Sequence, residues 1–327
     1  ELMSSEHTEI SAIVTYYNQP FDDLLFTLSS CVLQKGVDFD IVVADDCSNR
    51  DYHEDIERFF AFTGFSNYEI VRQPQNVKTV GNILSALGVS KGKYIKTIGS
   101  EDAFFSERTL RDVVDYCIDN DCQLGFGKYC AFQKRDGDYT CGEFEAPRNK
   151  QSYLEPKPPR RILEQQLINA DWIPGGAQFF EKGLFEQLLA VLQHDYGIKY
   201  CEDFAATIAL CDPDSRIGFL DEFLIYYAVG SGISTSSAQT RPYAIYADHQ
   251  SLYGKIGKRN PYGMAFRRAR TLFALRKFVA LRTPVYHKLR KREFESRSRN
   301  DDGRSCDLVG DFFFRCMGLA EAYMRSS

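Results

Sequence analysis

The sequence has no long apolar run: none of its 327 residues belong to an uncharged, predominantly apolar stretch of 18. A membrane-spanning helix needs about 20 such residues, so none is predicted. The polar start, residues 1–9, lacks the basic and apolar regions of a signal peptide, and residues 1–8 are expected to be disordered or an added leader. These absences favour the cytoplasm, with a peripheral position at the inner face of the cell membrane as the alternative.

The sequence also lacks the cysteine spacings of metal and redox sites. Its ten cysteines are scattered, with no Cys-x-x-Cys pair and no histidine at zinc spacing. We interpret them as reduced thiols of the core rather than as a disulfide framework. Apolar residues make up 44% and charged residues 26% of the chain, a balance that excludes intrinsic disorder and allows one large domain or two smaller ones.

The first hundred residues alternate short apolar runs with helical patterns. This order is typical of an α/β fold in which helices cover both faces of a mostly parallel sheet. No Gly-x-Gly-x-x-Gly follows the first strand and no Gly-x-x-x-x-Gly-Lys-Ser/Thr occurs, which argues against a dinucleotide-binding domain and a P-loop nucleotidase. The strands are predicted at 11–15, 40–44, 68–72 and 94–98, and the helices at 21–33, 52–62 and 79–89.

The rest of the chain is less regular and ends in a basic region. Glu155–Pro159 is predicted as an extended loop, and a boundary is placed near residue 236. Residues 241–300 hold 16 Lys or Arg against three acids, although the whole chain has a net charge of −5. Further helices are expected at 110–118, 182–192, 202–210, 265–279 and 308–324, and strands within 124–135.

The basic region predicts an anionic partner, which is a membrane surface, a phosphate-bearing substrate or nucleic acid. The helix at 265–279 groups apolar residues on one side and basic residues on the other, and such a helix can lie on an anionic bilayer. The alternatives are that the helix packs its apolar side on the catalytic half, and that the basic region neutralises the acidic front of the chain. The last helix is apolar enough to dock on the core or on another subunit, so a homo-oligomer stays open.

Polar residues follow the predicted strands, at the edge where parallel sheets bind ligands. Asp45 or Asp46 can accept the imide N–H of a uracil or thymine, with Tyr17 stacking on the base. Glu101 or Asp102 can hold a divalent cation that neutralises a diphosphate. The later Asp203, beside Glu202, can act as a base toward an acceptor hydroxyl. Each assignment competes with a solvated turn residue or, for the last pair, with helix capping.

Taken together, these segments resemble the nucleotide-sugar domain of the family-two glycosyltransferases with the GT-A fold. The resemblance covers about residues 9–236 and implies transfer from a nucleotide-diphosphate sugar with inversion at the anomeric carbon. It implies a nucleotide-sugar-binding half at 9–118, an acceptor-binding and catalytic half at 119–236, and a basic helical region at 237–327. The segments that carry it are Ser11–Asn18, Val42–Ser48, Gln75–Thr79 with Asn82, Gly92–Asp102, Glu202-Asp203 and Gly230–Ser234.

The resemblance also assigns roles. Asp203 would be the catalytic base with Glu202 as its partner, and Glu101 with Asp102 would hold Mg²⁺ or Mn²⁺. The family usually shows Asp-x-Asp at the fourth strand, whereas this chain has Gly99-Ser100-Glu101, which weakens the metal assignment. The residues assigned to the base, ribose or phosphates are Thr15, Tyr17, Asn18, Asp45, Asp46, Asn76, Lys78, Asn82 and Ser100.

The expected reaction is the addition of one sugar, most simply a hexose from a UDP-sugar, to a glycan or polyprenyl-linked oligosaccharide of a bacterial capsule or O-antigen. No Gln-x-x-Arg-Trp follows Asp203, and that motif marks the processive synthases of the family. Trp172 with Gly175-Gly176 can form a platform for a sugar or the diphosphate, or can be a turn beside a core indole. Two other classes stay open: a sugar-phosphate nucleotidyltransferase, and a non-catalytic module that binds glycan or nucleic acid. Nucleic acid is not expected as a partner, because the front of the chain is acidic.

Overall fold

A computed structural model describes residues 8–135, 138–147, 150–155, 158–169, 173, 175–229, 241–259, 263–282 and 309–326. The strands are β1 (Ile10–Tyr16), β2 (Phe39–Asp45), β3 (Tyr68–Arg72), β4 (Tyr94–Gly99), β5 (Ala103–Phe104), β6 (Leu124–Arg135), β7 (Asp138–Ala146), β8 (Gln178–Glu181) and β9 (Gly218–Ala228). The helices are α1 (Phe21–Val32), α2 (His53–Thr63), α3 (Lys78–Val89), α4 (Thr109–Asp119), α5 (Gln151–Leu154), α6 (Pro159–Asn169), η1 (Gly175–Ala177), α7 (Lys182–Val191), η2 (Leu192–Tyr196), α8 (Phe204–Ala209), α9 (Arg241–Arg259), α10 (Gly263–Arg282) and α12 (Asp311–Ser326). Among these helices, none combines the length and apolar character that crossing a membrane requires.

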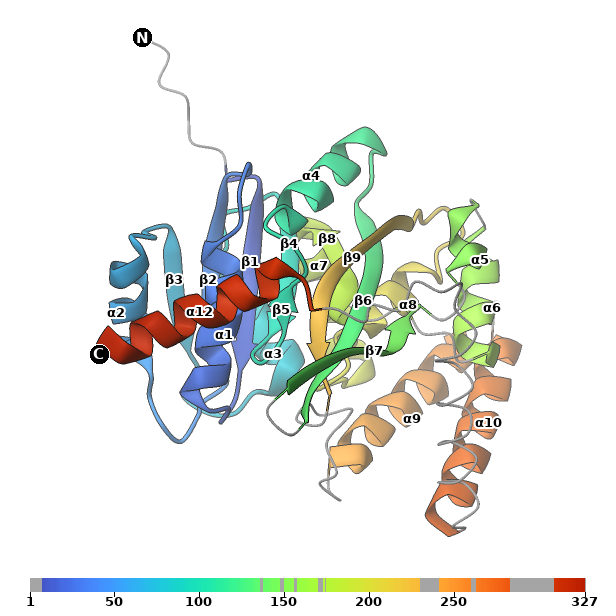
Figure 1. The fold of residues 1–327 in the computed structure, drawn as a ribbon. Coiled ribbons are helices and arrows are strands. Elements are labelled where there is room, and N and C mark those ends of the chain that lie inside the picture. Colours follow the sequence, from blue (N-terminus) through green and yellow to red (C-terminus); the bar gives the residue numbers. More distant parts are fainter. Residues whose placement is uncertain are drawn as a thin grey trace.

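The sheet has the order β3-β2-β1-β4-β8-β6-β9-β5, with β7 paired to β6 (Figure 1). The first four strands of this order are parallel, as the alternation of strands and helices predicts. Beyond β4 the sheet is mixed, because β8 runs antiparallel to β4 and β6 while β6 and β9 are parallel. Strands β8 and β9 were not predicted, since the middle of the chain has no clear periodicity. The predicted fold class is confirmed.

Both faces of the sheet are covered, and the alternation of side chains along each strand divides the core in two. On β1, Ile13 packs with residues of α3 and α7, whereas Ala12 and Val14 pack with residues of α1, α2 and α12. Strands buried on both faces are mostly apolar, which is why Ala12–Val14 and Ile41–Ala44 read as continuous runs in the sequence. Six of the nine cysteines within the described ranges are buried.

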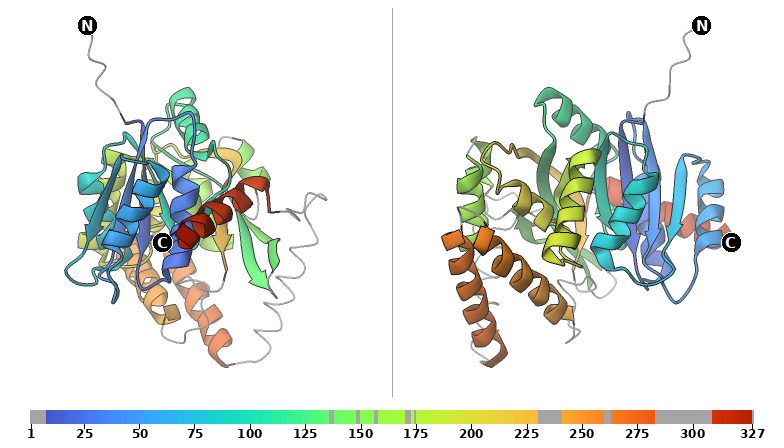
Figure 2. Two further views of the ribbon diagram at one scale, coloured as in Figure 1. Left: turned by 60° about the vertical axis from the view of Figure 1, so that its left-hand side comes forward. Right: turned by 180° about the vertical axis from the view of Figure 1, so that it is seen from behind.

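The C-terminal helix α12 returns to the N-terminal half and lies across α1, ending near α2 (Figures 1 and 2). Its buried side chains include Phe313, Cys316 and Tyr323. The Tyr323 hydroxyl donates to the backbone oxygen of Asp55, 3.1 Å away. The predicted docking of this apolar helix on the core is therefore confirmed within the chain.

Helices α9 and α10 pack against each other, and α10 also contacts α6. Phe266 and Ala269 of α10 are buried, while Arg267 and Arg268 are exposed, so the amphipathic pattern is realised by packing. Leu272, assigned to the apolar side, is nevertheless 37% exposed, and Leu275 is 56% exposed. The extended loop was expected to run to Pro159, but α6 already begins there, at a first helical position where proline loses no hydrogen bond.

Candidate active site at the carboxyl ends of the strands

The turns after β1, β2 and β4 meet at one edge of the sheet. Tyr16 is in register with Asp45, and Thr15 with Gly99. The Asp46 N–H donates to the Tyr16 oxygen at 3.1 Å, and the Ser100 N–H donates to the Thr15 oxygen at 2.9 Å. The structure thus brings together three of the predicted polar segments, as parallel strands require.

The turn after β1 is fastened to the turn after β2. The Asn18 N–H donates to the Ser48 hydroxyl at 2.9 Å, and the Asn18 side-chain oxygen accepts the Asn49 N–H at 2.7 Å. Between these contacts the Tyr17 side chain is 44% exposed. An exposed ring on a fixed turn is available for stacking on a planar ligand.

The Asp45 carboxylate is buried and fully engaged by the protein. One oxygen accepts the N–H and the hydroxyl of Ser48, at 2.8 and 2.6 Å. The other accepts Nη1 of Arg72 at 2.8 Å, and Nη2 of Arg72 reaches the Ser48 backbone oxygen at the same distance. Arg72 ends β3 in register with Asp45, so the adjacency of the two strands creates this pair. Arg72 was not predicted as a site residue, because no local pattern in the sequence shows that β3 neighbours β2.

Asp46 holds the start of α3. Its two oxygens accept the N–H groups of Val77 and Lys78, at 2.6 and 3.0 Å. Burial raises the pKa of Asp46, while the two N–H groups and the Lys78 charge act in the opposite direction. The Asn76 side-chain oxygen also accepts the Lys78 N–H, at 3.2 Å. Asp46 and Asn76 therefore shape the segment that carries Lys78.

Two predicted residues present buried polar atoms without a partner in the described part of the chain. The Asn82 amide nitrogen donates to the Ala44 oxygen at 2.9 Å, but its side-chain oxygen has no hydrogen bond. The Ser100 hydroxyl is likewise buried and unpaired. Native proteins satisfy nearly all buried polar groups, so such atoms at a sheet edge are suited to a ligand.

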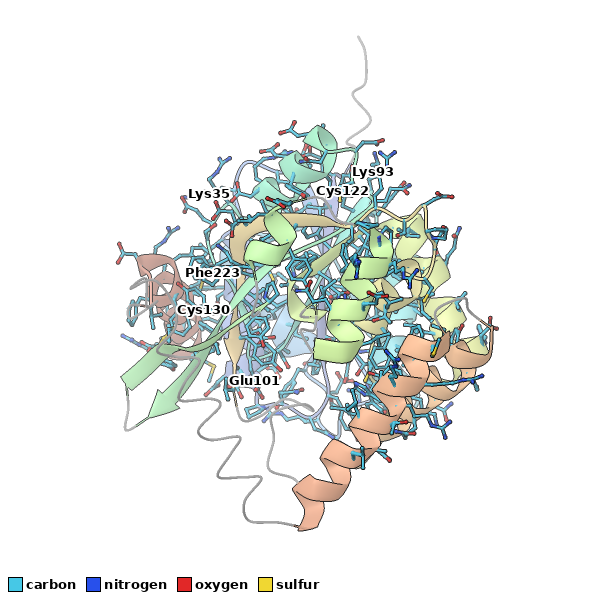
Figure 3. The ribbon with its side chains drawn as sticks, turned by 90° about the vertical axis from the view of Figure 1, so that its right-hand side faces the viewer. Lys35, Lys93, Glu101, Cys122, Cys130 and Phe223 are labelled. Atoms are coloured by element: carbon cyan, nitrogen blue, oxygen red, sulfur yellow. The ribbon has the colours of Figure 1, made fainter. Side chains whose placement is uncertain are left out.

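The turn after β4 carries Glu101 and Asp102 in different environments. Figure 3 shows Glu101 at one end of the sheet and Lys93, which precedes β4, at the other. The Asp102 carboxylate accepts the Ala228 N–H at 2.8 Å, and burial raises the pKa of Asp102 to about 8. Asp102 thus ties the turn to the end of β9. No group of three His, Cys, Asp or Glu side chains suited to a metal occurs among the described residues.

Lys96, on β4 beneath this turn, is fully buried. Its Nζ donates to the backbone oxygens of Thr97, at 2.8 Å, and Gly176. Burial lowers the pKa of Lys96 to about 7, although the Asp102 charge acts in the opposite direction. The buried ammonium anchors η1, which the sequence did not reveal because Lys96 occupies an otherwise apolar strand.

Glu202 and Asp203 lie directly before α8 and pack against η1. A Cβ atom on Gly175 would stand 3.0 Å from Cβ of Asp203 and 3.1 Å from Oε1 of Glu202, so only glycine fits without displacement. The buried Gln178 amide donates to the Asp203 backbone oxygen at 3.4 Å. Gly175 and Gln178 thereby connect the acidic pair to the sheet.

The environment of the acidic pair separates its two pKa values. Burial and then the Asp203 charge raise the pKa of Glu202 to about 8. Burial raises the pKa of Asp203 to about 6, while backbone N–H groups oppose this and the Asp248 charge adds to it. At neutral pH Glu202 is mainly protonated and Asp203 mainly ionised. Two carboxyl groups held at different pKa values can serve as a hydrogen-bond donor and a base.

Backbone strain gathers at the same edge. Asn18, Cys47, Lys78 and Glu101 have positive φ angles of 60°, 65°, 69° and 85°, and Asp121 is the fifth non-glycine residue of this kind within the described ranges. Such conformations cost about 1–3 kcal/mol each and concentrate at functional sites. Trp172 and the segment Gly230–Ser234 lie outside the described residues.

Comparisons with known proteins agree with this geometry. No curated protein sequence matches the chain. The crystal structure of S. aureus TarS matches with a TM-score of 0.50 and 17% identity over 77% of this chain, which spans 40% of that chain's length. S. aureus TarS 1-349 in complex with UDP matches with a TM-score of 0.53 and 16% identity, over 98% of this chain and 92% of that one. At these identities the likeness shows the fold.

The model of the family described as "Glycosyl transferase family 2" matches residues 11–189, more than half of the chain. This match covers the turns after β1, β2 and β4 and the start of α3. It decides against the nucleotidyltransferase and the non-catalytic binding module. The predicted family is confirmed: the chain belongs to glycosyl transferase family 2, and it is a glycosyltransferase with the GT-A fold.

Proposed function

We propose that the protein moves a sugar from a UDP-sugar to a hydroxyl group of an acceptor glycan, by a single displacement that inverts the anomeric carbon. The observation that carries this proposal is the buried acidic pair Glu202 and Asp203, which packs against Gly175 and is joined to the sheet through Gln178. A structural relative supports a uridine nucleotide, because S. aureus TarS 1-349 was solved in complex with UDP. The inverting course is what the resemblance to the family-two glycosyltransferases implies, and a single carboxylate acting as a base fits it.

The edge formed by β1, β2 and β4 is the proposed donor site. Tyr17 stacks on the base, and Thr15, Asn18 and Asp45 shape the turns around it. Arg72 holds the Asp45 carboxylate in place through their 2.8 Å ion pair. The unpaired Asn82 oxygen and Ser100 hydroxyl are the donor site's free hydrogen-bonding atoms.

Lys78 and Asn76 are proposed near the diphosphate. The positive φ of Lys78 and the two N–H bonds to Asp46 fix the segment at the N-terminus of α3. The Lys78 Nζ lies 5.9 Å from the centre of the Tyr200 ring, beside the loop that leads to Asp203. A cation there can balance charge on a leaving diphosphate, as can the positive end of the helix.

The transfer step follows from these positions. The acceptor oxygen attacks the anomeric carbon, its proton passes to the Asp203 carboxylate, and the bond from that carbon to the diphosphate oxygen breaks with its electron pair on UDP. Glu202, being protonated, donates a hydrogen bond and adds no second negative charge. The contacts of Gly175 and Gln178 hold the base against the sheet during the attack.

A divalent cation fits the site only if the protein shares its coordination with the diphosphate and water. Asp102 is engaged with Ala228 and has a raised pKa, so Glu101 is the proposed protein ligand, together with diphosphate oxygens and water. Mg²⁺ commonly keeps several waters and few protein ligands. When bound, such an ion neutralises charge on the leaving diphosphate.

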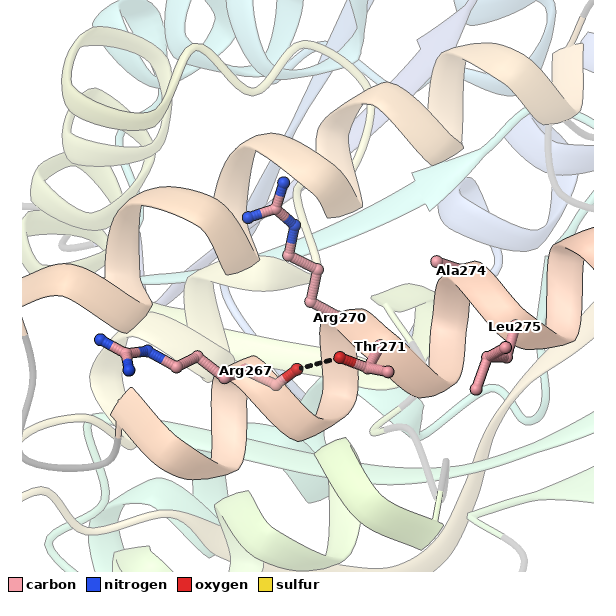
Figure 4. A pocket seen from close by; sticks show the side chains of 5 residues that line it. All are labelled: Arg267, Arg270, Thr271, Ala274 and Leu275. Carbon is pink, nitrogen blue, oxygen red and sulfur yellow. Dashed lines mark hydrogen bonds between the residues drawn. The ribbon is translucent and has the colours of Figure 1, made fainter.

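The proposed acceptor is a glycan or lipid-linked oligosaccharide of a bacterial surface polysaccharide, taken at an anionic membrane surface. The exposed side of α10 supports this: Arg267, Arg270, Thr271, Ala274 and Leu275 line a shallow hollow there (Figure 4). Each basic residue near an anionic surface contributes about 1 kcal/mol. Binding to vesicles with and without anionic lipid, at two salt concentrations, tests this part.

The central experiment compares wild type with Asp203→Asn in a screen of UDP-sugars, measuring release of UDP without acceptor and with candidate acceptors. We expect the variant to lose transfer at least about 100-fold, the usual value of a positioned base, while binding UDP as wild type does. Glu186→Gln, on the exposed side of α7, is the control. Full turnover by the Asp203 variant would dismiss the assigned base.

A further inference from the structure

One carboxylate outside the family-matched region grips the loop that carries the acidic pair. Asp248 of α9 is 4% exposed. Its Oδ2 accepts three consecutive backbone N–H groups, from Lys199, Tyr200 and Cys201, at 3.1, 2.6 and 3.1 Å. These residues directly precede Glu202 and Asp203. Asp248 is one of only three acids among residues 241–300.

Helix α9 also contacts the residues that precede and follow the segment 199–201. The Ser251 hydroxyl donates to the Tyr196 oxygen, and Nζ of Lys255 donates to the Asp195 oxygen at 3.0 Å. Beyond the acidic pair, the Phe204 ring packs edge-on against His249, with centroids 4.7 Å apart. Helix α9 therefore fastens residues 195–204 as a unit, in the region where Figure 1 shows α9 below α8.

The gripped segment also touches the proposed donor side. The Lys199 oxygen accepts the Val80 N–H of α3 at 3.0 Å. The neighbouring Tyr200 ring lies under Nζ of Lys78. A shift of residues 199–201 would consequently move the base relative to the segment proposed to face the diphosphate.

We propose that Asp248 is a positioning residue for sugar transfer: its carboxylate fixes residues 199–201 and so sets the place of Asp203 relative to Lys78. The inference rests on the proposed role of Asp203. An ionised oxygen suits three N–H donors, because charge-assisted hydrogen bonds are about twice as strong as neutral ones. Without the carboxylate, three partly buried N–H groups lose their partner.

The Asp248 charge also acts on the base. Asp203 is surrounded by Glu202, Asp248 and the Cys201 thiol, and burial with the nearby acids raises the Cys201 pKa, so that the thiol stays neutral. The nearby Asp248 charge raises the pKa of Asp203. Removing this charge favours the ionised form of Asp203 and moves the acid limb of the pH–rate profile to lower pH.

Two variants and a control separate these effects. Asp248→Asn keeps an oxygen acceptor but removes the charge, and Asp248→Ala removes both. Gln250→Ala is the control, because this side chain of the same helix faces Arg270 of α10, at 3.2 Å, and not residues 195–204. For each we would measure kcat and donor KM, the dissociation constant of UDP by calorimetry, and the thermal midpoint.

We expect Asp248→Ala to lower kcat by about 10–100-fold, the effect of a misplacement on the order of 1 Å, with UDP affinity changed less than about threefold. Asp248→Asn should lower kcat less than Asp248→Ala does and should move the acid limb of the pH–rate profile to lower pH. Gln250→Ala should change neither kcat nor the pH–rate profile. If Asp248→Ala does not fold, the measurements on Asp248→Asn test the positioning role by themselves.

Wild-type kcat and an unmoved acid limb in folded Asp248→Asn would overturn the inference. Parallel losses of kcat and UDP binding that follow the folded fraction would also overturn it, since they indicate a structural role alone. The proposed function is tested apart from this: an active Asp203→Asn dismisses the base whatever the Asp248 variants do. An inactive Asp203→Asn beside fully active Asp248 variants dismisses only the positioning role.

Discussion

The pH dependence of sugar transfer follows from the raised pKa of Asp203. As a base, Asp203 works only when ionised, and burial places its pKa at about 6 instead of the ordinary 3.8. The ionised fraction is then about 90% at pH 7, about 50% at pH 6 and about 10% at pH 5. Transfer should fall about tenfold between pH 7 and pH 5. With an ordinary pKa the fall would be less than about 10%.

The assay is the initial rate of UDP release at low donor concentration, from pH 5 to pH 7, after the folded fraction at each pH has been checked by circular dichroism. Residual hydrolysis by Asp203→Asn supplies the control, because its rate should not follow this curve. A wild-type rate that stays flat between pH 5 and pH 7 would refute the reasoning, since the base would then be a group with an ordinary pKa.

Three further predictions concern stability, donor binding and metal. Glu202→Gln should raise the free energy of unfolding at pH 8 by at least about 1.4 kcal/mol and give little gain at pH 4.5. The reason is the raised pKa of Glu202, about 8, which makes the wild-type protein lose stability as the pH rises between those two values. Urea unfolding at both pH values measures the difference. Arg72→Met should destabilise the fold by about 1–3 kcal/mol and raise donor KM more than it lowers kcat, because it leaves the Asp45 carboxylate without its cation. Arg325→Met is the control and should be near neutral, because the ion pair of Arg325 with Glu321 is exposed. A chelator should lower turnover reversibly, and Glu101→Gln should raise the Mg²⁺ concentration for half-maximal rate by about tenfold or more; turnover indifferent to both would exclude Glu101 as a ligand.

The sequence predicted the first half of the fold closely, for a physical reason. Strands covered on both faces are mostly apolar, and helices that cover them repeat apolar residues every three or four positions. The predicted strand at 40–44 is thus β2, Phe39–Asp45, and the predicted helix at 79–89 is α3, Lys78–Val89. Strand β8 has only four residues, and its pairing with β4 and β6 is set by long-range contacts that no local pattern records.

The polar residues after the strands could be found in the same way, because the carboxyl ends of parallel strands share one edge. The individual role of each residue could not be predicted from the sequence. Asp45 and Asp46 are adjacent in sequence, but Asp45 pairs with Arg72 while Asp46 holds the start of α3. Which partner each receives depends on the order of strands in the sheet and on the path of the chain after β3.

By itself, the sequence determined the alternation of strands and helices, the edge at which the polar turns gather, and the acidic pair at Glu202 and Asp203. Only the tertiary structure joined Arg72 of β3 to Asp45, Lys96 of β4 to η1, and Asp248 of α9 to the residues that precede the acidic pair. Their effects are electrostatic and depend on burial and distance, which local patterns of residues do not contain.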